Sequence, residues 1–386
     1  MIRFTTAGES HGEVLVVVIE GIPAGLTINL EDINIDLARR QRGYGRGKRM
    51  LIETDIIKVL SGIRHGRTLG SPITMSIANK DFESWMQVMS PVSSSSSVGV
   101  SLLRPRPGHA DLSGLMKYGV NDFRDILERA SARETAARVA VGAVCKMLLK
   151  KFGIIVMSYT LQIGSIVANM FSIAENEVQQ LAEMSYVRCP DAVASKKMIE
   201  LINEVSINGD TLGGKIVVIA KNVLVGLGSH TQWDLKLDGR IAQSLISIQA
   251  VKAVEFGAGS NLAECFGSVS HDEIFYSETK GFYRRTNRAG GIEGGMSNGE
   301  PIVVTCTMKA IPSLANPLRS VNIVTKEAET AELVRSDICA VPALAVVAEA
   351  AVAIELSKAL SEKFGSDCLK DMENSFNMYK ERLGAL

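Results

Sequence analysis

The pattern of apolar and polar positions predicts strands and helices spread over the whole chain. Residues 14–19 form an unbroken aliphatic run, which is typical of a strand buried on both faces. Residues 340–356 are also apolar, but Pro342 and Glu349 interrupt them, so we expect a buried helix there and not a membrane span. The same pattern predicts further helices over 29–40, 111–116, 136–143 and 237–248, paired strands over 51–60, and a strand over 302–308.

The second half of the chain repeats landmarks of the first. At an offset of 201, Gly12 falls on Gly213 and Gly25 on Gly226. At an offset of 229, residues 62–80 fall on residues 291–309 with matching glycines, a proline, isoleucines and a lysine. We therefore predict one domain over residues 1–386 with pseudo-twofold repeats of about 1–150 and 200–365, each supplying a sheet and a packed helix. A ligand is expected where the halves meet, a usual place for a pocket.

Composition excludes several classes of protein. Lysine plus arginine and aspartate plus glutamate both total 42 among 386 residues, so no global charge favours nucleic acid or an anionic membrane. The six cysteines form no CxxC pair, and we expect reduced thiols in a cytoplasmic protein, without a zinc site or a disulfide framework. No signal-type apolar segment follows Met1. Five consecutive serines at 93–97 suggest a flap.

A local concentration of positive charge lies at residues 39–49. Six of these eleven residues are basic and none is acidic: Arg39, Arg40, Arg42, Arg46, Lys48 and Arg49. The spacing is not that of a phosphate-binding P-loop. Because arginine dominates, the loop suits bidentate recognition of carboxylates and phosphates. A phosphate-binding or nucleic-acid-binding protein using this loop is therefore an alternative, and a solvated basic loop is the plainest one.

Residues 104–142 join a stiff loop to a helix start. Two prolines and a glycine hold the loop that carries Arg106 and His109, and stiff loops suit ligand contact. Further on, Ser131 can cap the helix that follows, and Arg129 and Arg133 flank it. Free backbone N–H groups at a helix start, with arginines beside them, favour an anion.

Residues 8–12 and 290–299 are two further stretches with recognisable patterns. Residues 8–12, GESHG, match the G-x-S-x-G pattern of serine hydrolases, but a strand follows the serine where the hydrolase fold requires a helix. The glycine-rich residues 290–299 cannot form a helix and invite close approach by a flat or anionic ligand. Taken alone, the pair Gln249-Ala250 predicts a turn. Asp337, two residues after Arg335, predicts an ordinary ion pair.

Together these segments resemble the chorismate synthase family in its short bacterial form. The resemblance rests on six separated blocks in the family's order: GESHG at 8–12, RQRGYGRGKRM at 40–50, RPGHAD at 106–111, DFRDILERASARETAARVA at 122–140, GGIEGGMSNG at 290–299 and RSDICAVPA at 335–343. It implies an α+β fold in which helices lie between two antiparallel sheets, a β-α-β sandwich that agrees with the duplication.

The resemblance also implies a reaction. Phosphate is eliminated in the anti-1,4 sense from 5-enolpyruvylshikimate 3-phosphate to give chorismate, the last common step of the shikimate pathway. Reduced FMN is required although there is no net redox change. The abundance of arginine then has a physical reason, since the substrate's two carboxylates and phosphate, with the flavin phosphate, need neutralisation in a dry pocket.

Site residues follow from the matched motifs. His11 is expected to protonate the departing phosphate, His109 to face the N1 side of the flavin, and Asp337, assisted by Ser10, to take the proton from flavin N5. For substrate the matching positions are Arg40, Arg46, Arg49, Arg106 and Arg133, of which Arg40 and Arg46 are sometimes assigned to NADP. For FMN they are Arg129, Ala130, Ser131, Gln249, Ala250, Gly294, Lys309, Ala310, Ile311, Pro312, Ser313 and Arg335. Ala310 departs from the proline usual in the family.

The resemblance implies a homotetramer as well. Without an added reductase domain, the chain is expected to rely on FMN reduced by an external flavin reductase, with NADPH as an indirect reductant. A net flavin oxidoreductase is the second enzymatic alternative, and it would consume NADPH in proportion to product.

Overall fold

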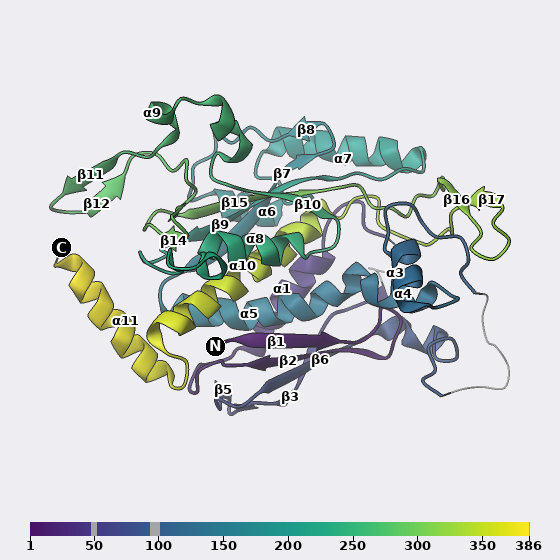
Figure 1. Cartoon of the computed structure of the whole chain (residues 1–386), viewed down its shortest axis with the longest axis horizontal. Coiled ribbons are helices and arrows are strands. Elements are labelled where there is room, and N and C mark those ends of the chain that lie inside the picture. Colours follow the sequence, from purple (N-terminus) through teal and green to yellow (C-terminus); the bar gives the residue numbers. More distant parts are fainter. Residues whose placement is uncertain (48–51, 93–100, 386) are drawn as a thin grey trace.

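The computed structural model describes residues 1–47, 52–92 and 101–385, so Arg49 and the serine run at 93–97 lie outside the described residues. A layer of helices lies between two antiparallel sheets (Figure 1). The first sheet has the order β1-β2-β6-β3, with β1 Arg3–Ala7, β2 Val14–Glu20, β6 Ile73–Ala78 and β3 Ile57–Ser61. The second has the order β10-β15-β9-β7-β8, with β10 Val251–Phe256, β15 Ile302–Met308, β9 Gly214–Lys221, β7 Ile155–Ile163 and β8 Ile166–Val167.

Four helices form the middle layer: α1 Leu30–Gln41, α5 Thr135–Lys151, α8 Leu237–Ile246 and α10 Val341–Phe364. Helix α5 packs on β2, and α10 packs on β7 and β9. The remaining helices of the described residues are α3 Asp111–Tyr118, α4 Arg124–Ala130, α6 Val178–Met184, α7 Ala192–Ile207, α9 Gly267–Ser270 and α11 Leu369–Gly384, with 3-10 helices at η1 Lys80–Ser84, η2 Ala132–Glu134, η3 Trp233–Leu235 and η4 Gly259–Glu264. Short hairpins pair β4 Ile63–Arg64 with β5 Arg67–Thr68, β11 Ile274–Ser277 with β12 Gly281–Arg284, β13 Ile292–Glu293 with β14 Met296–Ser297, and β16 Arg319–Val321 with β17 Ala328–Thr330.

The α+β class and the helices between antiparallel sheets are confirmed. Two predictions were wrong in detail. Burial alternates along β2 between buried and half-buried positions, because only one face of this strand packs on the helices. Within the described part of residues 51–60 a single strand, β3, is present, and it pairs with β6.

Helices α5 and α10 approach closely because a glycine lies at their crossing. A Cβ atom on Gly142 would lie 2.2 Å from the Cβ of Ala350 and 2.5 Å from its Cα. Helix α10 has no polar stripe, since most of its residues are buried, which explains the apolar run seen in the sequence. In the described part of the chain, no helix combines the length and the hydrophobicity needed to cross a bilayer.

We expect Gly142→Ala to lower the free energy of unfolding by about 1–3 kcal/mol, because the added methyl overlaps a backbone that cannot move alone. Urea denaturation measures this change. The control is Gly239→Ala in α8, where the added Cβ meets nothing nearer than 3.9 Å and the side is exposed. That variant should be neutral or more stable, since alanine favours helix over glycine by about 1 kcal/mol. Equal effects in the two variants would contradict the close helix crossing.

A buried network of charges lies inside the helical layer. Glu349 of α10 accepts hydrogen bonds from Arg39 at 2.9 and 3.0 Å, from Lys146 at 2.6 Å and from the Ser158 hydroxyl at 2.9 Å. Burial alone would raise the pKa of Glu349, but the cations of Lys146 and Arg39 outweigh it and hold this pKa well below its usual range. Arg39 therefore anchors α1 to the core, and the next residue on that helix is the predicted substrate ligand Arg40.

Candidate active site

Three of the predicted substrate arginines meet at the end of α1. Arg133 donates from Nη1 to Asp55 at 2.6 Å, and Nη1 of Arg40 lies 3.8 Å from the other oxygen of the same carboxylate. Arg46 lies with its Nε 3.2 Å from Oδ2 of Asp337, whose Oδ1 accepts the amide of Gly47 at 2.6 Å. Arg40 comes from the last turn of α1, Arg46 from the loop after it and Arg133 from η2, and the three side chains are buried or nearly so.

Three carboxylates lie among these three guanidinium groups, since Nη2 of Arg133 is also 3.8 Å from Oε2 of the buried Glu53. Burial is the main reason that the pKa of Arg40 is lowered, to about 10, and the neighbouring cations Arg133 and Arg46 lower it further. Among the described residues, Nε of Arg40 and Nη2 of Arg133 are buried without a hydrogen-bond partner. Buried donors without partners cost stability, and an anionic ligand would satisfy them.

His11 is held by a carboxylate and an indole ring. Its Nδ1 lies 2.9 and 3.0 Å from the two carboxylate oxygens of Glu128 in α4, and its ring stacks on Trp85 with the centroids 4.0 Å apart. Ser10 beside it is buried and donates its amide to the carbonyl of Glu128 at 2.9 Å. The hydroxyls of Ser10 and Ser131 are 3.2 Å apart, and Ser131 caps η2 through the amide of Arg133. The predicted cap at Ser131 is therefore present.

His109 belongs to a second group of contacts. Its Nδ1 bonds to Asp111, the first residue of α3, and Arg106 grips the same carboxylate through Nε at 2.8 Å and Nη2 at 3.0 Å. Arg106 also donates to the Ser313 hydroxyl at 2.7 Å. The carbonyl of Ser313 accepts the Ser336 hydroxyl at 2.7 Å, which places this group next to Asp337 in sequence and in space. The two groups thus adjoin through Ser313 and the 336–337 segment.

Asp111 should make the stability of the protein depend on acid pH. Burial alone would raise its pKa, but hydrogen bonds from His109 and Arg106 outweigh burial and lower it from 3.8 to about 2. The stabilisation is therefore complete above about pH 4 and is lost as pH falls toward 2, and it amounts to roughly 2 kcal/mol. We expect Asp111→Asn to remove that part of the decline in urea midpoint between pH 4.5 and 2.5. Asp125→Asn, on the exposed side of α4, should leave the decline unchanged.

The predicted FMN positions divide into two contact groups and several isolated ones. Arg129 is exposed, and its guanidinium donates to the backbone carbonyls of Thr6 and Gly8 and to the Thr6 hydroxyl, at and just after the end of edge strand β1. Lys309 joins the turn at Ala250 to the His109 loop, since its amide donates to the Ala250 carbonyl at 3.0 Å and its ammonium group donates to the carbonyl of Gly108. Gln249 keeps a buried Oε1 without a partner among the described residues. Gly294 lies in the turn of the β13–β14 hairpin, Ala310, Ile311 and Pro312 follow β15, and Ala130 and Arg335 lie at the end of α4 and in the loop before α10.

A link also joins Arg129 to the segment before Gln249. Arg129 donates to the Thr6 hydroxyl at 2.7 Å, and that hydroxyl donates to Glu134 at 3.0 Å. The Glu134 carboxylate accepts a hydrogen bond from Nε of Arg138, and Nη1 of Arg138 donates to the Ser247 hydroxyl at 2.7 Å. Residues far apart in sequence therefore form one connected polar face along the start of α5.

Comparison with known proteins decides the family. The family profile described as chorismate synthase matches residues 2–360. The chain belongs to the chorismate synthase family. A curated chorismate synthase from Endomicrobium trichonymphae is 72% identical over the full length of both chains, and one from Geobacillus sp. (strain WCH70) is 54% identical over 95% of each. A solved structure titled "Crystal Structure of Chorismate Synthase" aligns with a TM-score of 0.81 at 42% identity, covering 100% of this chain and 99% of that chain.

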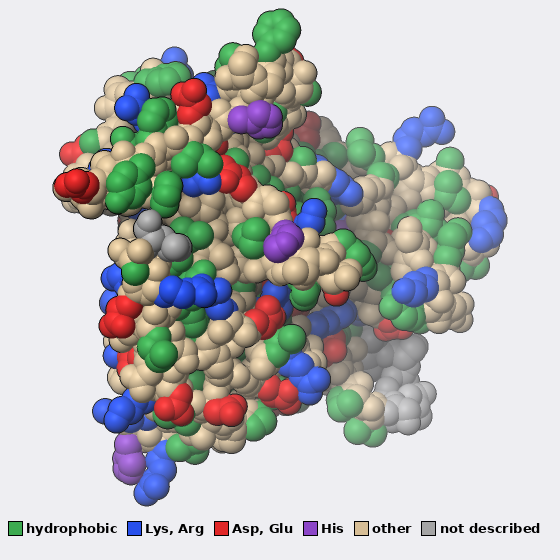
Figure 2. Space-filling view, turned by 60° about the vertical axis from the view of Figure 1, so that its left-hand side comes forward, with side chains coloured by type: hydrophobic (Ala, Val, Ile, Leu, Met, Phe, Trp, Pro, Cys, Tyr) green, Lys and Arg blue, Asp and Glu red, His purple; other side chains and the backbone are tan. Residues whose placement is uncertain are grey.

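Membership in the chorismate synthase family confirms the prediction of a carbon–oxygen lyase of aromatic biosynthesis. The alternative of a nucleic-acid-binding protein is not supported. In the described part of the basic loop, Arg39 and Arg40 are buried and Arg46 is paired with Asp337, so these charges face the interior. Figure 2 shows acidic and basic side chains interspersed on one face of the molecule, which agrees with the neutral composition.

Sequence reasoning missed several residues of this chorismate synthase site. Glu128, Asp55 and Trp85 contact His11 or the arginines, yet none was singled out. Glu128 lies inside the quoted block at 122–140, beside Arg129, and an acidic residue among arginines could have drawn attention to it. Asp55 and Trp85 carry no such signal, because only the fold brings them to the site.

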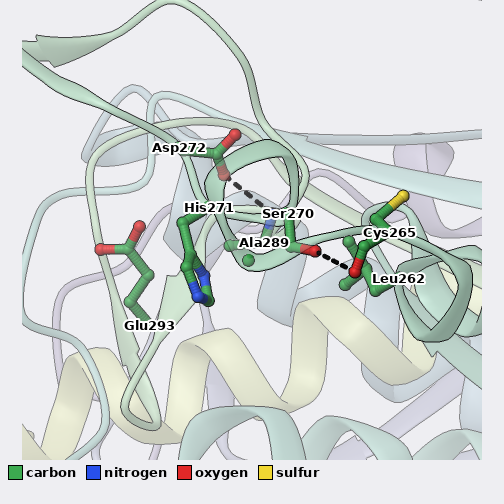
Figure 3. Close-up of a pocket in the computed structure, with 8 residues that line it drawn as sticks. Leu262, Cys265, Ser270, His271, Asp272, Ala289 and Glu293 are labelled. Carbon is green, nitrogen blue, oxygen red and sulfur yellow. Dashed lines mark hydrogen bonds between the residues drawn. The ribbon is translucent and has the colours of Figure 1, made fainter.

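A surface pocket lies away from these residues. A pocket of about 430 Å³ is lined by Leu262, Cys265, Gly267, Ser270, His271, Asp272, Ala289 and Glu293 (Figure 3). His271 and Glu293 point into it, while Asp272 turns away to accept backbone amides of the 288–289 segment. It contains none of the predicted site residues, although Glu293 adjoins Gly294. The polar cluster around Arg40 and Arg133 therefore remains the candidate active site.

Proposed function

We propose that this member of the chorismate synthase family eliminates phosphate from 5-enolpyruvylshikimate 3-phosphate by binding it at Arg40, Arg46, Arg106 and Arg133. In the elimination the C3–O bond to phosphate breaks, a hydrogen leaves C6, and a new double bond completes the diene of chorismate. The observation that carries the assignment of the site is the gathering of buried guanidinium groups around Asp55, where Nε of Arg40 and Nη2 of Arg133 have no hydrogen-bond partner among the described residues. Arg49, outside the described residues, is proposed as a further ligand.

The two histidines are proposed as the proton donors. His11, fixed through Nδ1, protonates the leaving phosphate, because an imidazole changes its charge near neutral pH and can recover its proton between turnovers. His109 is held by Asp111 and Arg106 and is proposed to face the N1 side of the flavin. Asp337 is proposed to receive the proton that originates at C6, with the buried hydroxyl of Ser10 assisting.

Reduced FMN is proposed as the cofactor. The residues present fit it, since Oε1 of Gln249 is buried without a hydrogen-bond partner in the described part of the chain, and Lys309 and Arg129 supply cations near backbone segments that an anionic ligand can approach. When bound, reduced FMN would supply transient electron density to the allylic system and accept the C6 hydrogen. Arg129, Ala130, Ser131, Gln249, Ala250, Gly294, residues 309–313 and Arg335 would hold it in place.

We also propose that the fold arose by internal duplication. Without β8, the second sheet has the order β7-β9-β15-β10, which matches β1-β2-β6-β3 element for element. The amide of Gly25 donates to the Thr68 carbonyl at 2.9 Å, and at the offsets read from the sequence the amide of Gly226 donates to the Ser297 carbonyl at 2.8 Å. The Thr68 and Ser297 hydroxyls each donate to a backbone carbonyl at 2.6 Å.

The remaining expectations are also proposals. The family resemblance supports a cytoplasmic homotetramer supplied with reduced flavin by an external reductase, with NADPH as the indirect electron source. All six cysteines of the chain are free, which agrees with a reducing compartment. Sedimentation velocity would test the tetramer, and a requirement for added reductase in NADPH-driven assays would test the reductant.

The proposed reaction is tested by anaerobic turnover. The protein is incubated with 5-enolpyruvylshikimate 3-phosphate and photoreduced FMN, and chorismate, phosphate and flavin absorbance are followed together. Chorismate and phosphate should appear in equal amounts while the flavin stays reduced. Stoichiometric oxidation of flavin or NADPH with product would instead support a net oxidoreductase.

A further inference from the structure

The carboxylate of Glu128 contacts both the ring and the backbone of His11. Both of its carboxylate oxygens lie within 3.0 Å of Nδ1 of His11, and Oε2 also accepts the His11 backbone amide at 2.8 Å. The side chain is buried, with 2% of it exposed, although it carries a charge. Helix α4 presents Glu128 to the 8–12 loop, and the Ser10 amide bonds to its carbonyl. The carboxylate and the imidazole are therefore held in one fixed relation.

Other charged groups face the same imidazole from each neighbouring element. From α4, Nη1 of Arg124 lies 3.7 Å from Oε1 of Glu128, and its guanidinium lies 5.2 Å above the Trp85 ring. From η1, Asp81 accepts the indole N–H of Trp85 at 3.2 Å. Glu9 belongs to the loop of His11 itself, with its carboxylate directed at Gly12. Glu128 is the carboxylate of this set that bonds the ring.

The direction of the hydrogen bond follows from the chemistry of the partners. An ionised carboxylate can only accept, so Nδ1 of His11 must carry the hydrogen and donate it. A proton that His11 transfers must then be the one on Nε2, on the far side of the ring. In sites of this geometry a carboxylate orients the catalytic histidine and attracts a positive charge on its ring.

We propose that Glu128 is a positioning residue that fixes the tautomer of His11 and favours its protonated form. Nε2 then carries the proton that is transferred to the leaving phosphate. This inference rests on the proposed role of His11. A carboxylate that served only to tie the loop to α4 would hold the chain in place without changing how readily His11 binds a proton. The two readings therefore differ in a titration.

The protein contains a built-in reporter for that titration. Trp85 stacks on His11, and the only other tryptophan, Trp233, is exposed, so Trp233→Phe leaves Trp85 as the sole indole. A protonated imidazole in contact with an indole quenches its fluorescence, whereas the neutral ring does so far less. The fluorescence of flavin-free Trp233→Phe protein between pH 4 and 9 thus follows the protonation of His11.

In the Trp233→Phe background, Glu128→Gln should lower the midpoint of this titration by about one pH unit or more, because an anion near the imidazole is lost. Glu128→Asp keeps the negative charge, so its midpoint should lie close to that of the parent protein. His11→Ala should abolish the transition and identifies its origin. An unchanged midpoint in a folded Glu128→Gln protein, judged by far-ultraviolet circular dichroism, would overturn the proposal. If Glu128→Gln does not fold, Glu128→Leu removes the same charge, and an unchanged midpoint in that folded variant would also overturn the proposal.

Turnover distinguishes this inference from the proposed function. If both hold, the alkaline limb of the kcat profile moves to lower pH in Glu128→Gln by about as much as the fluorescence midpoint does. If the fluorescence midpoint moves but His11→Ala keeps full turnover, Glu128 tunes His11 and the proposed role of His11 is wrong. If turnover needs His11 but neither midpoint nor profile moves, the role of His11 stands and that of Glu128 falls.

Discussion

Replacing His11 by alanine should lower kcat by about 10²-fold or more while KM changes by only a few-fold. The reason is that, in the proposed reaction, the imidazole bound through Nδ1 to Glu128 donates a proton in the transition state and contributes little to ground-state binding. Steady-state kinetics with photoreduced FMN under anaerobic conditions measure both constants. His109→Ala should show a loss of the same order, through the second imidazole.

The control for these variants is His65→Asn. His65 is exposed in the turn of the β4–β5 hairpin with φ 50°, and asparagine tolerates that left-handed backbone. This hairpin lies at the opposite end of the first sheet from α4 in Figure 1, so kcat should be unchanged. Full turnover in both His11→Ala and His109→Ala would remove the assignment of proton donors.

Arg40→Met should weaken substrate binding by about 10²-fold or more and yet leave the unliganded protein as stable or more stable. Holding the Arg40 charge in the interior is costly, since burial and the neighbouring cations lower its pKa to about 10, and this corresponds to roughly 3 kcal/mol. Methionine has similar length without the charge, and replacing poorly compensated buried charges by apolar groups is often stabilising. Calorimetric titration gives the affinity, and urea denaturation gives the free energy of unfolding.

The adjacent residue supplies the matched control. Arg39 is fully compensated by Asp36, Glu183 and Glu349, so Arg39→Met should cost about 3–5 kcal/mol by leaving buried carboxylates without a partner. Two neighbouring arginines of one helix would then respond with opposite signs of stability change. A large loss of stability in Arg40→Met, with substrate affinity unchanged, would mean that Arg40 is structural.

Local sequence patterns were enough to locate the elements that carry the site. The strand at 302–308 and the helix beginning at Asp111 appear where the pattern places them, because apolar periodicity and turn residues act over short distances. The buried α10 was predicted despite Glu349, since a single charge in a long apolar run is compatible with a paired interior residue. The motif blocks supplied the histidines and arginines.

What the sequence did not predict depends on contacts between distant segments. The pairing of Arg133 with Asp55 spans 78 positions and that of His11 with Glu128 spans 117, and no local pattern encodes either. Similarly, the burial of Arg39 is decided by Glu349, 310 positions away. The basic run at 39–49 therefore suggested a solvated or nucleic-acid-binding loop, whereas the fold buries Arg39 and Arg40, pairs Arg46 with Asp337 and leaves Arg42 exposed.

The central claim, that guanidinium and imidazole groups from separate segments surround one multiply anionic substrate, is tested most directly by a crystal structure of the protein with 5-enolpyruvylshikimate 3-phosphate and FMN. We expect substrate carboxylate and phosphate oxygens within hydrogen-bonding distance of Arg40, Arg106 and Arg133, with Nε2 of His11 directed at the phosphate. Substrate bound away from these residues, or phosphate facing neither histidine, would contradict it.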